Sequence, residues 1–330
     1  MRSSQVIKIL LQIRFLLEWI VLRGMLRCLR SGDFQRARRR TIRLSHMGTY
    51  VLRQNWKWTL KNLSLVYGNA LEPDIRKKLA RLVFEEHFQS YMEGLRLLDI
   101  TVESETMGRF REAYAKNRGI ILCSVHLGSW EPGIRRIRGE GVPIVVVFRK
   151  AYNPMSDREF MKIRSSYDVE WVPEDDARAI IRALQEHKVL ILMTDLDTPH
   201  GGIPAAFLGV EAMCPPGPAH LALRYHPLIV PMVSIRTGIG KASLIVEHPI
   251  DPDQFADRPG AAKEITSAVN SIFEKWIVQY PEQYNWLHPR WESRPDGSRW
   301  KLRDATELLW ASPKRHDFPV LPSRVYTLLH

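Results

Sequence analysis

The stretch IILCSVHLGSWEPG, residues 120–133, is the most informative part of the chain for its fold. Its first six residues are predominantly apolar and have the length of a buried strand. His126 follows at once, and Glu131 comes five positions later, directly before Pro132. Proline is tolerated in the first turn of a helix and not in its interior. The stretch therefore predicts a strand, a loop that carries His126, and a helix that begins near Glu131.

His126 and Glu131 are spaced for one kind of chemistry. Five positions turn an ideal helix by about 140°, so the two side chains cannot share one face of one helix. A carboxylate at the helix entrance is instead expected to reach back to one imidazole nitrogen, where it fixes the tautomer and supports the imidazolium. Ser124 and Ser129 flank the motif without a nucleophile-elbow pattern. We therefore expect His126 to act as a general base on a substrate hydroxyl, with a purely structural histidine as the alternative.

Apolar runs and helical stretches keep alternating downstream of this motif. Strands are expected at residues 119–125, 142–148, 189–195, 227–235 and 241–249. Helices are expected at residues 132–140, 154–165, 175–187, 216–225 and 261–280. Residues 35–98 have helical periodicity, with one long helix after Pro73. Continuous apolar strands between helices indicate a sheet covered on both faces, so the predicted fold class is α/β, a central, largely parallel sheet flanked by helices.

The charge of the chain is concentrated at its N-terminus. Of the formal net charge of +12, residues 1–43 carry +9, from eleven Lys and Arg against two acids. Anionic partners are therefore expected: lipid head groups, nucleic acid or an acidic carrier protein. Nucleic acid is the weakest of these, because no helix-turn-helix, zinc-finger or RNA-binding signature accompanies the charge. The three cysteines form no CxxC pair, which argues against a disulfide framework or a zinc site and fits a reducing compartment.

The N-terminal segment is predicted to be an amphipathic helix. Its apolar residues follow the spacing of one helical face: Val6, Ile9, Leu10, Ile13, Leu16, Leu17, Ile20 and Val21. Charged residues interrupt the segment too often for a membrane span or a secretory signal. A helix that lies in a membrane interface, with its basic residues near anionic lipid, is the preferred interpretation. The alternative is a helix docked on the protein's own core.

Several blocks of sequence resemble a known enzyme family. The segment VHLGSWE resembles the HxxxxE motif of the lysophospholipid acyltransferase superfamily. Further blocks in the same order resemble the bacterial late acyltransferases of lipid A biosynthesis, the lauroyl- and myristoyl-transferase group: FRKAYNP, TDLDTPHGG, AAFLGVEAMCPPGPAHLALRYHPLIVP and PEQYNWLHPRWESRP. The resemblance covers roughly residues 36–295. Pro215, Pro216 and Asp168 depart from the family pattern, and these departures bear on the acceptor more than on the reaction type.

The resemblance implies a reaction and its partners. A fatty acyl chain would pass from an acyl carrier protein thioester to a hydroxyl of a lipid A precursor or related glycolipid, with no cofactor and no metal. The protein would sit on the cytoplasmic face of the inner membrane as a peripheral or monotopic protein. Residues 1–45 would form a basic amphipathic membrane-associating segment, residues 46–295 the acyltransferase domain, and residues 296–330 a peripheral C-terminal tail.

The resemblance also assigns roles to residues. His126 and Glu131 would be catalytic, as the base and its orienting partner, while Arg149, Arg164 and Asp195 would be substrate-binding. The resemblance also favours a role for Asp195 in holding Arg or His side chains in place. Arginine suits bidentate binding of phosphate oxygens, on the acceptor or on the carrier's phosphopantetheine. Backbone amides of the LGSW segment or a basic side chain would stabilise the oxyanion.

Three other interpretations stay open. Asp195 and Asp197 form a DxD, which in a glycosyltransferase holds a metal and a sugar nucleotide, but no glycine-rich nucleotide loop precedes it. An acyltransferase acting on a lysophospholipid or another glycolipid is a second possibility, although the chain lacks the FPEGTR-type block of glycerolipid enzymes. The third is a non-catalytic basic membrane-surface protein. A cluster of aromatic and basic residues, Trp286, His288, Arg290 and Trp291, is interpreted as packing.

Overall fold

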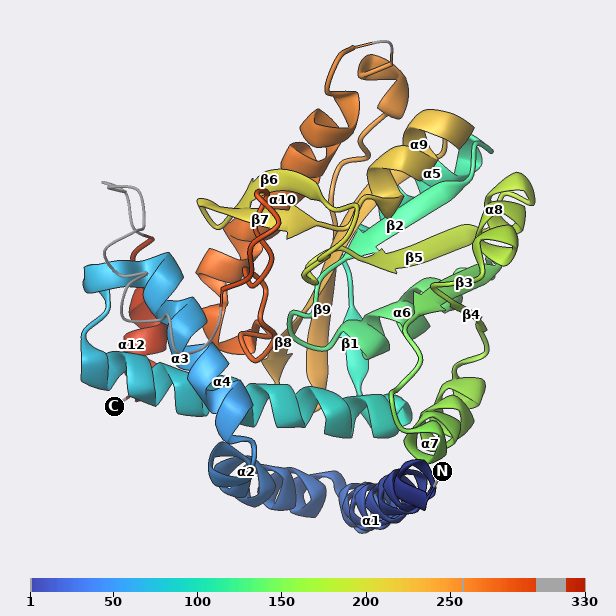
Figure 1. The fold of residues 1–330 in the computed structure, drawn as a ribbon. Helices are drawn as coiled ribbons and strands as arrows, with labels where there is room; N and C mark the ends of the chain where they lie inside the picture. Colours follow the sequence, from blue (N-terminus) through green and yellow to red (C-terminus); the bar gives the residue numbers. More distant parts are fainter. Residues whose placement is uncertain (1, 257, 301–318, 330) are drawn as a thin grey trace.

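A seven-stranded sheet forms the centre of the protein in the computed structural model, which describes residues 2–256, 258–300 and 319–329 (Figure 1). The strands lie in the order β1-β9-β8-β2-β5-β3-β4. Their bounds are β1 Thr101–Glu103, β2 Ile120–Ser124, β3 Ile144–Phe148, β4 Glu170–Pro173, β5 Val189–Met193, β8 Leu228–Gly238 and β9 Lys241–Val246. Neighbouring strands are parallel except β8 and β9, which are antiparallel. The predicted α/β class with a largely parallel sheet is confirmed.

Helices cover both faces of this sheet. Their bounds are α5 Met107–Ala115, α6 Trp130–Arg138, α8 Ala177–Gln185, α9 Gly217–Tyr225 and α10 Ala261–Gln279. Helix α7, Pro154–Arg164, packs instead against the N-terminal helix α1, Arg2–Arg30. Strand β2 illustrates why helices are needed on both faces, because all five of its residues are buried. Ile121 and Cys123 pack in the core under α8, α9 and α10, while Ile120 and Leu122 pack in a second core under α5 and α6. Successive side chains of a strand point to opposite faces, so an apolar run such as this one needs a helical layer on each side.

Four helices precede the sheet: α1 Arg2–Arg30, α2 Phe34–Val51, α3 Arg53–Tyr67 and α4 Pro73–Leu95. Helix α4 is the long helix predicted after Pro73, which occupies its first position as proline prefers. It runs across the edge of the sheet at which β2 ends, and α1 and α2 lie on its far side (Figure 1). Among the described residues, no helix is both long enough and apolar enough to cross a membrane.

Some elements were not predicted from the sequence. Strands β6 Ile203–Phe207 and β7 Val210–Cys214 form a hairpin whose two turn residues, Leu208 and Gly209, have φ of 51° and 70°. Such turns usually carry Asn-Gly or Gly-Gly, so leucine at the first position hides the signal. The predicted tail also holds a helix, α12 Ser323–Leu329, whose Val325 is fully buried in the main core. Residues 301–318 of that tail lie outside the described part of the chain.

Candidate active site

The topology of the sheet brings His126 and Asp195 together. Strands β2 and β5 are parallel neighbours, with Ser124 opposite Met193 at their carboxyl ends. His126 and Asp195 each stand two residues beyond those paired positions, so they meet at the edge of the sheet where α/β proteins commonly bind ligands. The imidazole Nδ1 lies 2.8 Å from Asp195 Oδ1, and the main-chain N–H of His126 donates to Oδ2 at 2.9 Å.

The partner of the imidazole is therefore Asp195 and not Glu131, which corrects the expectation from the sequence. Helix α6 does begin with Trp130 and Glu131, as predicted. The Glu131 carboxylate, however, is seated against α4, where its Oε2 occupies the space beside Gly94. Asp195 is only 2% exposed and both of its oxygens contact His126, so it lies behind the histidine.

The contact between His126 and Asp195 shifts the pKa values of both side chains. Burial opposes a charge on the ring, but the Asp195 carboxylate outweighs it and holds the pKa of His126 above its usual value. Burial likewise disfavours the ionised carboxylate, yet the imidazole and the His126 main-chain N–H keep the pKa of Asp195 below its usual value. A carboxylate on Nδ1 selects the tautomer in which Nδ1 carries the proton. Nε2 is then free to accept a proton from a substrate.

A cavity of about 620 Å³ opens in front of His126. His126, Glu131, Arg149 and Arg164 all line it, whereas Asp195 does not. Its apolar walls come partly from the second half of α1: Leu22, Met25, Leu26 and Leu29. The cavity thus has polar groups around the histidine and an apolar wall supplied by the N-terminal helix.

The two arginines of the cavity differ in setting. Arg164 lies between two aromatic rings, with its guanidinium carbon 4.9 Å from the ring centre of Phe148 and 4.8 Å from that of Trp171. Cation–π contacts of this kind hold a guanidinium in place. The Arg149 side chain is 59% exposed and pairs with Glu174, with Nε 2.5 Å from Oε1. Arg164 is therefore a fixed charge inside the cavity and Arg149 a charge at its rim.

Glu131 shares the cavity with Arg164. Burial raises the pKa of Glu131 to about 7, although the Arg164 guanidinium favours the ionised form. Its carboxylate also contributes to the raised pKa of His126. Glu131 is consequently a carboxyl group that changes charge near neutral pH, within electrostatic reach of the histidine.

Helix α4 supplies cavity residues that sequence reasoning missed: His87, Ser90, Tyr91 and Gly94. Their spacing of i, i+3, i+4 and i+7 places them on one helical face, which is the signal that could have found them. The rings of His87 and Tyr91 meet edge to face with centroids 5.0 Å apart. Burial lowers the pKa of His87 to about 4, so its imidazole is neutral at physiological pH.

Three backbone amides of the loop after β2 are already engaged. The N–H groups of Leu127, Gly128 and Ser129 donate to Val125, Gln283 and Ser234 carbonyl oxygens at 2.8, 3.0 and 2.8 Å. These three amides cannot also serve an oxyanion, so of the LGSW segment only the Trp130 amide, at the first position of α6, stays a candidate donor. The other expected donor type is a basic side chain, and Arg164 and Arg149 both line the cavity, as does Trp130.

The DxD and the aromatic cluster have structural contacts. The Asp197 carboxylate accepts from Ser293 Oγ at 2.6 Å, whereas the Asp195 carboxylate contacts His126. Within residues 2–256, 258–300 and 319–329, no group of three or more His, Cys, Asp or Glu side chains is arranged to hold a metal ion. Trp286, Arg290 and Trp291 are at most 1% exposed, which confirms their interpretation as packing.

Gly94→Ala provides a test of how Glu131 is seated. A Cβ at this position would lie 1.8 Å from Glu131 Oε2, so the carboxylate would have to move. We expect a loss of activity of about 10²-fold, as misplacement of a site group by about 1 Å commonly causes, with no loss of melting temperature because alanine favours a helix. Gly108→Ala in α5, where nothing lies within 4 Å, is the matched control. Equal activities of the two variants would contradict this placement of Glu131.

Comparison with known proteins supplies the family. The family model for "Bacterial lipid A biosynthesis acyltransferase" matches residues 6–293. The lipid A biosynthesis lauroyltransferase of Escherichia coli is 27% identical over 270 residues, which cover 77% of this chain and 84% of that protein. The lipid A biosynthesis palmitoleoyltransferase of the same organism is 23% identical over 269 residues, with the same coverage. A phosphatidylinositol mannoside acyltransferase of Mycobacterium tuberculosis is 24% identical over 185 residues, 54% of this chain and 56% of that protein.

Proposed function

Since the chain belongs to the bacterial lipid A biosynthesis acyltransferase family and is an acyltransferase, we propose that it moves a fatty acyl chain from an acyl carrier protein thioester to a hydroxyl of a lipid A precursor or related glycolipid. The observation that carries the proposal is the His126–Asp195 pair, at the head of a cavity that is polar around the histidine and apolar along α1. A basic surface at residues 1–43 suits both an acidic carrier and an anionic bilayer.

In the proposed reaction His126 is the general base. Nε2 takes the proton of the acceptor hydroxyl while its oxygen attacks the thioester carbonyl carbon. Asp195 holds the Nδ1–H tautomer and stabilises the imidazolium. The tetrahedral intermediate then collapses: the C–S bond breaks, the new C–O bond remains, and the leaving thiolate takes the proton back from Nε2. The guanidinium of Arg164 is the proposed electrostatic partner of the oxyanion, since a fixed cation in a water-poor site stabilises developing negative charge strongly.

Glu131 is proposed to support the imidazolium when ionised. Because the pKa of Glu131 lies at about 7, its charge is largely absent at pH 6 and largely present at pH 8. Glu131→Gln is therefore expected to approach wild-type activity at pH 6 and to fall progressively below it as pH rises through 7. The ratio of wild-type to variant kcat/KM across this range is the measurement. A ratio that does not vary with pH would contradict an electrostatic role for this carboxylate.

Helix α1 is proposed to place the cavity at a membrane surface. The eight apolar residues predicted to share one face of the helix are each 43–71% exposed, so this face is not docked on the described part of the chain. An exposed apolar face beside basic residues favours a position in the lipid interface. We propose the cytoplasmic face of the inner membrane as the location, where a carrier protein and a lipid acceptor can both be reached.

The membrane proposal has a direct test. Replacing Leu10 and Leu17, 60% and 59% exposed, by aspartate is expected to reduce the fraction bound to anionic vesicles by about tenfold or more. Val320→Asp, a residue 74% exposed outside α1, is the control and should bind as wild type does. Sedimentation with vesicles of mixed neutral and anionic phospholipid measures both. Undiminished binding of the double variant would refute interfacial insertion of α1.

The choice of substrates calls for a matrix of donors and acceptors. The purified protein is incubated with lauroyl or myristoyl groups on acyl carrier protein or on coenzyme A, and with a lipid A precursor, a phosphatidylinositol mannoside or a lysophospholipid. We expect transfer to the lipid A precursor from the carrier protein. Transfer to a lysophospholipid alone would refute the glycolipid acceptor, and equal use of coenzyme A would refute the carrier as the specific donor.

A further inference from the structure

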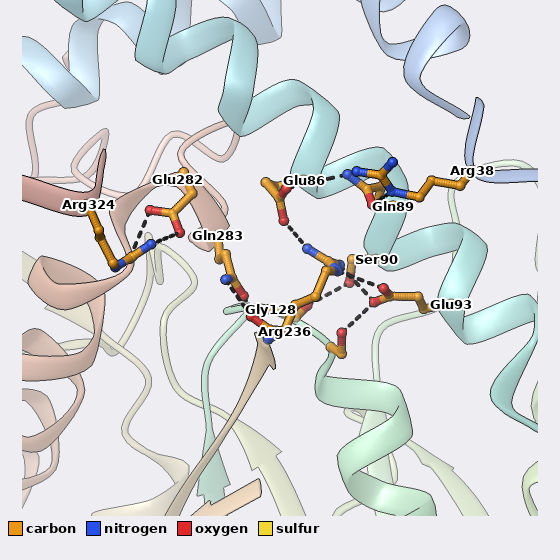
Figure 2. Close-up of polar contacts among 11 residues, drawn as sticks. Arg38, Glu86, Gln89, Ser90, Glu93, Gly128, Arg236, Glu282, Gln283 and Arg324 are labelled. Carbon is orange, nitrogen blue, oxygen red and sulfur yellow. Dashed lines mark hydrogen bonds and ion pairs between the residues drawn. The ribbon is translucent and has the colours of Figure 1, made fainter. Parts of the chain in front are cut away.

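A buried ion cluster lies directly behind the loop that carries His126 and Glu131. Figure 2 shows Arg236 of β8 between two glutamates of α4. Its guanidinium binds Glu93 through two parallel contacts, Nε to Oε1 at 2.6 Å and Nη2 to Oε2 at 2.7 Å, and its Nη1 contacts Glu86. The side chains of Arg236 and Glu93 are 8% and 2% exposed. A bidentate pair of this kind fixes the orientation of both planar groups.

Ser129 joins this ion pair to the active-site loop. It is fully buried, and its hydroxyl donates to Glu93 Oε2. Ser129 also stands at the N-cap of α6, yet its side chain makes no capping bond. A capping serine normally accepts from one of the first few helical N–H groups, commonly the third, and the third residue of α6 is Pro132, which has none. The hydroxyl is thereby left for the carboxylate on α4.

The same helix and strand hold the rest of the loop. Ser90 Oγ donates to the carbonyl oxygen of Gly128 at 2.9 Å (Figure 2). The side-chain amide of Gln283 accepts from the main-chain N–H of Arg236 at 2.9 Å and donates to the main-chain carbonyl of Arg236 at 3.0 Å. The main-chain carbonyl of Gln283 accepts from the N–H of Gly128. Gly128 has φ of +60°, and a Cβ there would lie 2.3 Å from Ser234 O. These contacts fix the position of the loop, and the bond from Ser129 to Glu93 is one of them.

Glu93 and Arg236 do not touch the substrate cavity. Neither belongs to the described residues that line it, whereas Gly94, the next residue of α4, does. Adjacent residues of one helix thus do two things: Glu93 holds Ser129, and Gly94 leaves the space in which the Glu131 carboxylate sits. Ser129 lies three residues after His126 and two before Glu131, so its hydrogen bond holds the chain between those two side chains.

We propose that Glu93 and Arg236 are positioning residues for acyl transfer, which act through the Ser129 hydroxyl to set the geometry between His126 and Glu131. The inference rests on the proposed function, because it assigns these residues to that reaction. Removing the Ser129 hydroxyl should misplace the base relative to Glu131 without opening the substrate cavity. The effect should therefore fall on kcat and leave KM for donor and acceptor nearly unchanged.

Ser129→Ala is the central variant, because it leaves the Arg236–Glu93 pair intact. Its matched control is Ser124→Ala, which removes another buried hydroxyl that bonds only to the Met232 carbonyl. We expect kcat of Ser129→Ala to fall at least tenfold, with both KM values within twofold of wild type and an unchanged melting temperature. Ser124→Ala should keep kcat within twofold. Adding Glu93→Gln to Ser129→Ala should lower kcat little further, because both act through the same hydrogen bond.

A second readout does not need turnover. The rate at which diethyl pyrocarbonate modifies His126, followed by peptide mass spectrometry and compared with exposed His220, should change at least threefold in Ser129→Ala and not in Ser124→Ala. Wild-type kcat in Ser129→Ala, or an equal loss in Ser124→Ala, would overturn the inference. If wild-type protein transfers no acyl group, the proposed function fails, and the modification rate alone then decides whether Ser129 positions His126.

Discussion

Replacing His126 by alanine is expected to lower kcat of acyl transfer by about 10³-fold, within the range that loss of a general base produces. The reason is that His126 lines the cavity and its Nδ1 is held by a carboxylate, which leaves Nε2 as the nitrogen that can accept a proton. The side chain is 25% exposed, so its removal leaves no large buried void and the protein should remain folded. The measurement is the single-turnover rate of acyl transfer for wild type and His126→Ala, and circular dichroism checks that the variant is folded.

His226→Ala is the matched control for that variant. His226 is also paired through Nδ1 to an aspartate, with Asp253 Oδ1 at 2.7 Å, but its side chain is 57% exposed and it lies on another part of the molecule. Its loss should leave kcat within twofold of wild type. An active His126→Ala variant, or an equal loss in His226→Ala, would remove His126 from the proposed mechanism.

Replacing Asp195 by asparagine is expected to produce the other large effect, a loss of about 10²–10⁴-fold in kcat. An amide in this position no longer supports the imidazolium and can donate to Nδ1, which selects the wrong tautomer. Because Asp195 is 2% exposed and shape is conserved, the fold should be retained. Asp197→Asn is the control, since Asp197 bonds to Ser293 and not to the histidine.

For Asp195→Asn we also expect a change in the pH dependence of kcat/KM. A base must be neutral to accept a proton, so activity is lost as pH falls through the pKa of His126. Asp195 holds this pKa above its usual value, which places the acidic limb of kcat/KM at higher pH than for an unperturbed imidazole. Asp195→Asn should therefore move that limb to lower pH. An acidic limb that stays in place would show that Asp195 does not govern the protonation of His126.

The sequence predicted the strands and helices around the site better than it predicted which of them are neighbours. Strand β3 follows β2 in the chain, yet β5 lies between them in the sheet. Local spacing predicts Glu131, close to His126 in sequence, as the partner of the imidazole, whereas the observed partner Asp195 is 69 positions away. The family resemblance already marked Asp195 as a site residue, but only the pairing of β2 with β5 explains its role.

Long-range polar contacts were beyond sequence reasoning for the same reason. Arg236 and Glu93 are 143 positions apart, and nothing in the local pattern of α4 or β8 pairs them. The apolar face of α1, in contrast, was predictable, because helical spacing depends on neighbours one turn away. The structure adds that the second half of this helix also walls the cavity, so one helix links the proposed membrane surface to the site.

The most direct test of the account follows the mass of the acceptor. Purified protein is mixed with lauroyl- or myristoyl-loaded acyl carrier protein and a lipid A precursor, and mass spectrometry is run for wild type and His126→Ala side by side. We predict that the acceptor gains one acyl group with wild type and none at the same time point with the variant. No gain with wild type, or an equal gain with the variant, would contradict His126-dependent acyl transfer to this glycolipid.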